Sequence, residues 1–304
     1  MPGVRVGHAH DLVARTGCTV VLFDDGCVCG VDVRGSAPGT RETDLLAAGA
    51  HVEIVHAIAL CGGSAFGLDA ACGVVQYLEE RGVGYAVGPW RVPIVPAAVI
   101  FDLSVGDGRV RPDRAMGHAA AVAASAETFA EGRVGAGAGA TVGKLAGHAH
   151  HMWGGVGTSA RRHGKLVVGA VVVVNAIGSI YDPDTRERIA GPRAADGAFL
   201  DDRDLLARGT LATPPGANTT LAVVATNARL PKALVTKVAQ MAHDGLARAV
   251  DPVHLTRDGD AAFACSLGAE DAPVDLVGTL AADAVAGAIA RAVRLANDRV
   301  TDFR

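Results

Sequence analysis

Aromatic residues are scarce in this 304-residue sequence. Phe, Trp and Tyr make up 4% of it, whereas half of all residues are hydrophobic and 39 are glycine. The volume of a core must therefore come from Val, Leu, Ile and Ala, with glycine where backbones approach closely. This composition favours close-packed layers of strands and helices and excludes a disordered chain.

The sequence also lacks an excess of positive charge. It has 28 Lys and Arg against 32 Asp and Glu, which leaves a net charge of −4 when histidine is neutral. Without a basic excess the chain has little to neutralise a phosphate backbone or to hold an anionic membrane surface. We therefore expect neither nucleic acid nor a membrane as a partner.

Long hydrophobic runs and paired cysteines are missing as well. The longest apolar run, residues 166–174, is shorter than the ~20 residues that a spanning helix needs, and the first residues lack the apolar stretch of a signal peptide. The six cysteines form no C-x-x-C pair, so we expect buried free thiols in a reducing compartment. These features predict a cytoplasmic protein.

Short apolar runs alternate along the chain in the manner of strands and helices. They predict strands at 19–23, 27–34, 55–60, 99–103, 166–174, 220–226 and 261–267. Helical spacing predicts helices over about 64–80, after Pro231, and through Val277, Leu280 and Ala284. Asp24-Asp25-Gly26 lies between two alternating runs and predicts a hairpin.

Two glycine-rich motifs resemble known sites without matching them. The segment 135–144 ends in Gly143-Lys144 but lacks the first Gly and the final Ser or Thr of a phosphate loop. A glycine-rich turn and a backbone cradle that places Lys144 near a reacting centre both remain open. Gly62-Gly63-Ser64 follows a predicted strand, as a nucleophile elbow would, but Phe66 stands where that motif needs Gly. Ser64 is therefore predicted to cap the following helix.

A histidine cluster, His148, His150 and His151, lies between these motifs and the C-terminal half. Metal sites use histidine, but here no carboxylate stands at helical spacing and no cysteine pair accompanies it. We therefore expect no metal and no cofactor.

The most unusual segment is residues 183–215, which contains 11 charged residues and four prolines. We expect a long exposed loop, of a kind that is usually functional or disordered. It ends just before Asn218-Thr219, where a buried strand begins, and Asp258 and Asp260 stand at the head of another predicted strand. These carboxylates could meet the Thr219 hydroxyl. A cut before Thr219 would free an α-amine, of pKa about 7.7–8.0, that could act as its base.

An ordered set of segments resembles one family of enzymes. The segments are Val6-Gly7-His8, 61–68, 92–99, Gly143-Lys144 and 218–220. They resemble the self-cleaving amide hydrolases that include L-aminopeptidase D-amidase/D-esterase, the β-aminopeptidases and the nylon-oligomer (6-aminohexanoate oligomer) hydrolases. The similarity spans nearly the whole chain.

The resemblance implies both a fold and a processing step. The fold is an α/β, four-layer αββα sandwich, similar to the N-terminal nucleophile hydrolases but with different connectivity, in a single domain over 1–304. The chain would cut itself between Asn218 and Thr219, into residues 1–218 and 219–304. The cleaved heterodimers would associate, as a tetramer, and act on a small peptide or amide.

The same resemblance implies roles for individual residues. Thr219 would be nucleophile and base, Asn175 the oxyanion donor, and Lys144 would lower the pKa of the hydroxyl or bind the intermediate. Asp258 and Asp260 would hold the nucleophile's amine and hydroxyl. A second group would line the substrate pocket: Phe101, Gly62, Gly63 and Ser64. Phe101 departs from the family, whose members often have Tyr there, so a phenolic donor to the oxyanion is missing.

Three hypotheses follow. The leading one is a self-processed amide hydrolase with Thr219 as its nucleophile. The alternative, which Phe101 keeps open, is an uncleaved relative that binds a small molecule or serves as an oligomeric scaffold. A serine hydrolase that uses Ser64 fits less well, because no histidine stands in an evident triad position.

Overall fold

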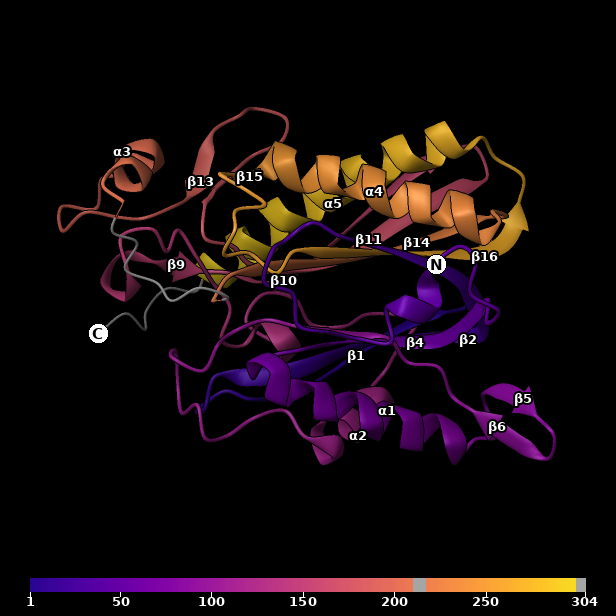
Figure 1. The fold of residues 1–304 in the computed structure, drawn as a ribbon. Coiled ribbons are helices and arrows are strands. Elements are labelled where there is room, and N and C mark those ends of the chain that lie inside the picture. Colours follow the sequence, from indigo (N-terminus) through magenta and orange to yellow (C-terminus); the bar gives the residue numbers. More distant parts are fainter. Residues whose placement is uncertain (210–216, 299–304) are drawn as a thin grey trace.

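The computed structural model describes residues 1–209 and 217–298, and it has four layers (Figure 1). Two long helices, α4 (Lys232–Ala249) and α5 (Val274–Asn297), cover one side. Two shorter helices, α1 (Ala70–Glu79) and α2 (Arg114–Val122), cover the other. Two layers of strands lie between these helix pairs, so the expected αββα architecture is confirmed.

The strands form one nine-stranded sheet that supplies both inner layers, with the order β10-β11-β14-β16-β2-β4-β7-β3 and β1 beside β2. The layer under α4 and α5 contains β10 (Gly155–His163), β11 (Leu166–Asn175), β14 (Thr219–Ala228) and β16 (Ala261–Glu270). The other contains β1 (Val4–Asp11), β4 (Ile54–Cys61), β7 (Ala97–Val99) and β3 (Thr40–Arg41). Strand β2 (Thr16–Val33) joins the two layers.

The hairpin predicted at Asp24-Asp25-Gly26 is wrong. Strand β2 runs through this segment, and its pairing with β4 shifts register between Leu22 and Cys27. On one edge of β2, residues 16–23 pair with β1 and residues 28–33 pair with β16, while β4 pairs with β2 on both sides of the shift. The turn residues therefore form an irregularity in one long strand, because β4 continues across it.

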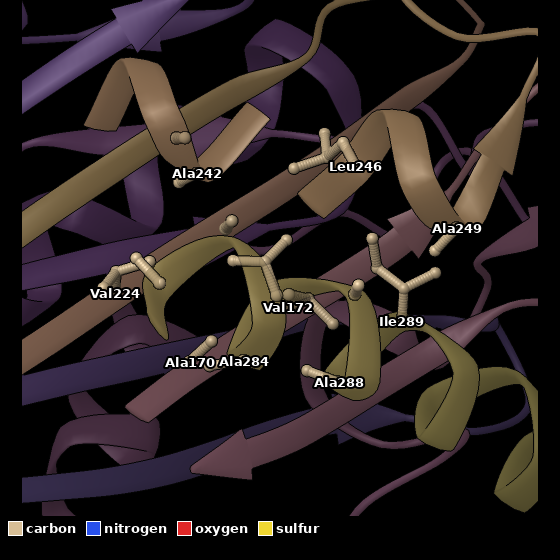
Figure 2. Close-up of a cluster of buried hydrophobic side chains, with 14 of the residues drawn as sticks. Ala170, Val172, Val224, Ala242, Leu246, Ala249, Ala284, Ala288 and Ile289 are labelled. Atoms are coloured by element: carbon tan, nitrogen blue, oxygen red, sulfur yellow. The ribbon is translucent and has the colours of Figure 1, made fainter. Parts of the chain in front are cut away.

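Alternation along the strands fills three separate cores. Val172 and Val224 face α4 and α5, as Figure 2 shows, whereas their neighbours Val171 and Val223 face the opposite strand layer. A third core lies between β4 and the helices α1 and α2. Small side chains bring the layers close together: a Cβ on Gly157 of β10 would lie 2.3 Å from the Ala288 carbonyl oxygen of α5. The scarcity of aromatic residues follows from this close approach.

The remaining elements are short. Strands β12 (Ser179–Tyr181), β13 (Arg188–Ala190) and β15 (Val250–Asp251) form a small sheet. Two further pairs are β5 (Tyr85–Val87) with β6 (Trp90–Val92), and β8 (Thr141–Val142) with β9 (Met152–Trp153). One α-helix, α3 (Asp202–Ala207), and four 3-10 helices, Asp44–Leu46, Ser64–Asp69, Gly135–Gly137 and His148–His150, complete the described elements.

The structure corrects two sequence predictions, for the strand at 99–103 and for the loop at 183–215, and confirms the one for the cysteines. The strand predicted over 99–103 ends at Val99, because the chain there leaves the ladder. The segment 183–215 is not one long loop, since it contains β13 and α3, while 210–216 lie outside the described residues. All six cysteines are free and five of them are buried, as predicted.

Helix α5 is long and apolar enough, by composition alone, to cross a membrane. In the fold, 67% of its most apolar window is buried, and it packs on β10 and on α4. It is therefore a core helix of the sandwich.

Leu246 tests the core between the helices and the sheet. It is fully buried on α4, so we expect Leu246→Ala to lower the free energy of unfolding by about 2–5 kcal/mol through lost burial and a residual cavity. Leu234, on the same helix, is 38% exposed, and Leu234→Ala should cost about 0.5 kcal/mol or less. Urea denaturation of both variants measures the difference, and equal losses would contradict this packing.

Candidate active site

Three strand ends meet around Thr219, the first residue of β14. In the antiparallel register of β11 and β14, Asn175 lies opposite Thr219. On the other side of β14, Asn218 bridges to Asp258 in parallel register, just ahead of β16. The sheet topology therefore brings Asn175, Thr219 and Asp258 together, although they are distant in sequence.

The Thr219 hydroxyl faces the peptide bond that precedes it. Its Oγ1 donates to the carbonyl oxygen of Asn218 at 2.6 Å, and the same oxygen accepts the N–H of Gly259 at 2.8 Å. Thr219 is only 3% exposed. A Cβ on Gly259 would lie 2.6 Å from Thr219 Oγ1, so a glycine there gives the hydroxyl its space. Two donors thus polarise a carbonyl in a site that excludes most water.

Lys144 is buried beside this bond. Its Nζ donates to the backbone oxygen of Asn175 at 2.9 Å, to Asn175 Oδ1 at 3.0 Å and to the Ala217 carbonyl at 2.9 Å, which occupies all three donors. Burial lowers the pKa of Lys144 to about 7, against the opposing influence of nearby carboxylates. Gly143 has a φ of +68°, which turns the chain so that Lys144 points inward. Of the two interpretations left open for this segment, the structure supports the one that places Lys144 at the candidate site.

The Asn175 side chain is fixed by four contacts. Its Oδ1 accepts from Lys144 and from the N–H of Thr141 at 3.0 Å. Its Nδ2 donates to the carbonyl oxygens of Phe101 at 3.2 Å and Ala217 at 3.3 Å. The Asn175 amide therefore donates both to Phe101 and to the segment that precedes Thr219.

The two carboxylates have different environments. Asp260 accepts the N–H of Thr220 at 2.6 Å through Oδ1 and contacts the His254 ring at 2.8 Å through Oδ2. Asp258 accepts the N–H of Leu255 through Oδ2 at 2.7 Å, and its Oδ1 has no hydrogen-bond partner within residues 1–209 and 217–298. Burial, together with the charge of Asp260, raises the pKa of Asp258 to about 7. Asp258 therefore exchanges its proton near neutral pH.

The segment 62–64 reaches this site through Asp102, a residue that the sequence analysis did not select. Asp102 Oδ1 accepts the N–H of Gly63 at 2.7 Å, and burial raises the pKa of Asp102 to about 6. A Cβ on Gly62 would lie 2.0 Å from Asp102 Oδ2. Asp102 follows Phe101, whose carbonyl holds Asn175, so this contact connects the glycine turn to the site. An acidic residue inside an otherwise apolar strand pattern was the available signal.

Ser64 does not cap the helix, contrary to the prediction. It has a φ of +53° and begins a 3-10 helix after Gly63, and no side-chain cap is present at that helix or at the start of α1. Its own N–H donates to the Ile100 carbonyl. The reason is that the chain makes a tight turn around Asp102, so the α-helix begins only at Ala70.

The clustered histidines lie in the 3-10 helix His148–His150 and at His151, which follows it. His150 donates through Nδ1 to the Arg193 carbonyl at 2.6 Å. In the part of the chain that the structure describes, no group of three His, Cys, Asp or Glu residues is arranged to hold a metal ion. Sequence reasoning also missed His254, which contacts Asp260 and carries no motif of its own.

Comparison with known proteins shows the family of the chain. Residues 1–302 match the model of peptidase family S58. An uncharacterized aminopeptidase of Mycobacterium bovis is 42% identical over 94% of this chain and 90% of its own. A 6-aminohexanoate-oligomer endohydrolase of Agromyces sp. is 34% identical over 90% of this chain and 75% of its own.

A solved structure shows the same fold. The L-aminopeptidase D-Ala-esterase/amidase of Ochrobactrum anthropi, described as a variant of the N-terminal nucleophile (Ntn) hydrolase fold, superposes with a TM-score of 0.72. It is 19% identical and covers 96% of this chain and 84% of its own. The chain thus belongs to peptidase family S58. It is a hydrolase that acts on amide or peptide bonds.

The raised pKa of Asp258 predicts a pH-dependent stability. Because its folded-state pKa, about 7, lies above the unfolded value of about 3.9, its contribution favours folding at low pH and is lost as the pH rises toward 7. The free energy of unfolding of Asp258→Asn, minus that of its parent, should therefore increase by on the order of 2 kcal/mol from pH 5 to pH 8.

Urea denaturation at both pH values measures this gain, with Thr219→Ala as the common background so that no chain is cut. Asp251→Asn, at a 37% exposed side chain, is the control. A gain for Asp258→Asn that is the same at both pH values would show that the carboxyl is ionised throughout.

Proposed function

We propose that this amide hydrolase cuts itself between Asn218 and Thr219 and then uses Thr219 as an N-terminal nucleophile. One observation carries the proposal: the buried Thr219 hydroxyl lies against a carbonyl oxygen that a second donor, the Gly259 N–H, already polarises. Donors held at such an oxygen stabilise the charge that develops there during acyl transfer. The cut would produce chains 1–218 and 219–304.

The self-cleavage step follows from these positions. Thr219 Oγ1 attacks the carbonyl carbon of Asn218, the bond to the Thr219 nitrogen breaks, and the acyl group moves to the hydroxyl as an ester. The hydroxyl proton leaves and a proton reaches the new amine. For both transfers we propose Asp258, which bridges to Asn218 beside this bond and whose pKa of about 7 suits a proton acceptor and donor at neutral pH. Water then hydrolyses the ester.

The mature enzyme would repeat this chemistry on a substrate. The freed amine of Thr219, with a pKa of about 8, takes the proton of its own hydroxyl. Once Ala217 moves away, Lys144 and the Asn175 Nδ2 each gain a free donor, because both now contact its carbonyl. These donors, with the Gly259 N–H, support an oxyanion without the phenol that Phe101 replaces.

The alternative is an uncleaved relative that binds a small molecule or forms a scaffold. The two hypotheses differ in whether the purified chain is cut. We expect the purified wild-type protein to yield a shorter chain of about 9 kDa out of 30.7 kDa. Thr219→Ala should remain intact and inactive, because no nucleophile remains. Denaturing gels with intact-mass analysis measure both.

Thr220→Ala is the matched control, since it removes the neighbouring hydroxyl and should leave the cut in place. An uncut wild-type chain that still hydrolyses amides would refute the self-processing. Cleavage of Thr219→Ala would place the nucleophile elsewhere.

Lys144 provides a second prediction with an internal control. Lys144→Met removes three hydrogen bonds around Asn175 and Ala217, so self-cleavage should slow by about 100-fold or more. Lys232 is also buried and also donates to three backbone carbonyls, those of Leu45, Ala50 and Val52.

We therefore expect Lys232→Met to destabilise the fold and to keep the cleavage rate of its folded fraction within a few-fold of the wild type. Self-cleavage rates of Lys144→Met and Lys232→Met are measured by time-resolved gels at a temperature where both variants are folded. Equal slowing by the two variants would assign Lys144 a structural role only.

For the substrate, we propose a small peptide or amide rather than a polymer surface, because the site lies within the sandwich and not on an exposed face. Amine release should be measured on amino-acid amides, short peptides, β-peptides and 6-aminohexanoate oligomers, with Thr219→Ala as the blank. Release from none of them by cleaved protein would refute this substrate class.

We also propose that cleaved heterodimers associate into a tetramer in the cytoplasm. The β5–β6 hairpin supports association, since it projects from the body of the fold in Figure 1 and exposes 71% of Trp90. Light scattering of the cleaved protein tests it, and a monodisperse single heterodimer would contradict it.

A further inference from the structure

His254 lies directly behind the carboxylate that faces the nucleophile strand. Because a carboxylate accepts, the His254 Nδ1–H donates to Asp260 Oδ2, at 2.8 Å, while Asp260 Oδ1 accepts the Thr220 N–H at 2.6 Å. The two side chains are 18% and 3% exposed. The carboxylate thus joins an imidazole to the backbone of the residue after Thr219.

The imidazole is itself held in place by α4. The ring of His243 meets that of His254 edge to face, with centroids 4.8 Å apart. His243 donates through Nε2 to the Asp32 carbonyl at 2.9 Å, and burial lowers its pKa, so it is neutral and packs as an uncharged ring. The backbone of His254 has a φ of +56°, a region that Gly adopts freely and that Asn, Asp and His enter more readily than other residues. Gly and Asn are therefore compatible with this backbone when the imidazole is replaced.

We infer that His254 is a positioning residue for Thr219: its Nδ1–H fixes the Asp260 carboxylate, which in turn fixes the backbone of the nucleophile strand. This inference rests on the proposed function, since it names what orients the same site. Without the imidazole donor, the nearly buried Oδ2 would lose the partner that it has among residues 1–209 and 217–298, and the carboxylate would keep only its contact with the Thr220 N–H. An unpaired buried charge of this kind is costly, so the carboxylate would turn or become protonated.

The backbone conformation of His254 supplies a matched pair of variants. His254→Asn accepts the positive φ and places an amide N–H near the position of Nδ1. His254→Gly accepts the same φ and has no donor. We expect the Asn variant to cut itself at a rate within about 3-fold of the wild type. The Gly variant should be slower by about 10- to 100-fold, the worth of one hydrogen bond to a charged group.

A third variant keeps the test valid if His254→Gly does not fold. His254→Gln fills the pocket but cannot bring its donor to the Nδ1 position, so it should be as slow as the Gly variant. Thermal unfolding of each variant in the Thr219→Ala background reports the structural cost separately from the rate. If Asn, Gly and Gln variants cut at one rate, whatever that rate is, the inference is overturned.

The contact is also measurable without any cleavage. In the intact Thr219→Ala chain, the hydrogen-bonded Nδ1–H of His254 should give a slowly exchanging proton signal in the imidazole N–H region, absent from His254→Gly and from Asp260→Ala. A wild-type chain that is never cut, with this signal present, would refute the proposed function and leave the His254 contact standing. A cut wild-type chain whose signal survives in Asp260→Ala would refute the contact alone.

Discussion

The burial of the Lys144 ammonium is the constraint on which the rest of the site depends. A charged amine that is 2% exposed requires acceptors for its three donors. It finds them at the end of β11, in Asn175, and in Ala217, which is 42 residues further along the chain. One ammonium therefore connects the Asn175 side chain to the segment before Thr219. The same burial lowers the pKa of Lys144 to about 7, so the group that holds the geometry also exchanges its proton near neutral pH.

Around this ammonium, strand pairing sets the positions of Asn175, Asn218 and Thr219, and the segment before β16 carries the carboxylates of Asp258 and Asp260. Strands β11, β14 and β16 are neighbours in one layer, and their pairing sets Asn175 opposite Thr219 and Asn218 beside Asp258. Small side chains let the helices pack closely on this layer, and the strand ends at Asn175, Asn218 and Thr219 are buried. In such surroundings the pKa of Asp258 is raised to about 7, whereas the Asp260 carboxylate is held by hydrogen bonds.

The sequence predicted more of the layers than of their connections. The apolar strand at 166–174 and the helix after Pro231 appear almost as expected, because their patterns are long and their faces uniform. The hairpin at Asp24-Asp25-Gly26 does not exist, since a short turn signal cannot show that β4 pairs with β2 on both sides of this segment. Ser64 was predicted as a cap for a similar reason, because only the contact of Gly63 with Asp102 reveals why the chain turns there. His254 carries no motif, so no local pattern could select it, whereas Asp102 left one signal, an acidic residue inside an otherwise apolar strand pattern.

What the sequence determined by itself is local: which stretches are apolar, where the glycines allow a turn, and that hydroxyl, amide, amine and carboxyl groups stand at 219, 175, 144, 258 and 260. Their resemblance to a family suggested roles, but not geometry. Only the tertiary structure decided that these groups meet, that Gly259 donates to the Asn218 carbonyl, and that Lys144 and Asp258 both titrate near pH 7. The physical reason is that hydrogen bonds and pKa values depend on distance and burial, and both are set by strand pairing between segments far apart in the chain.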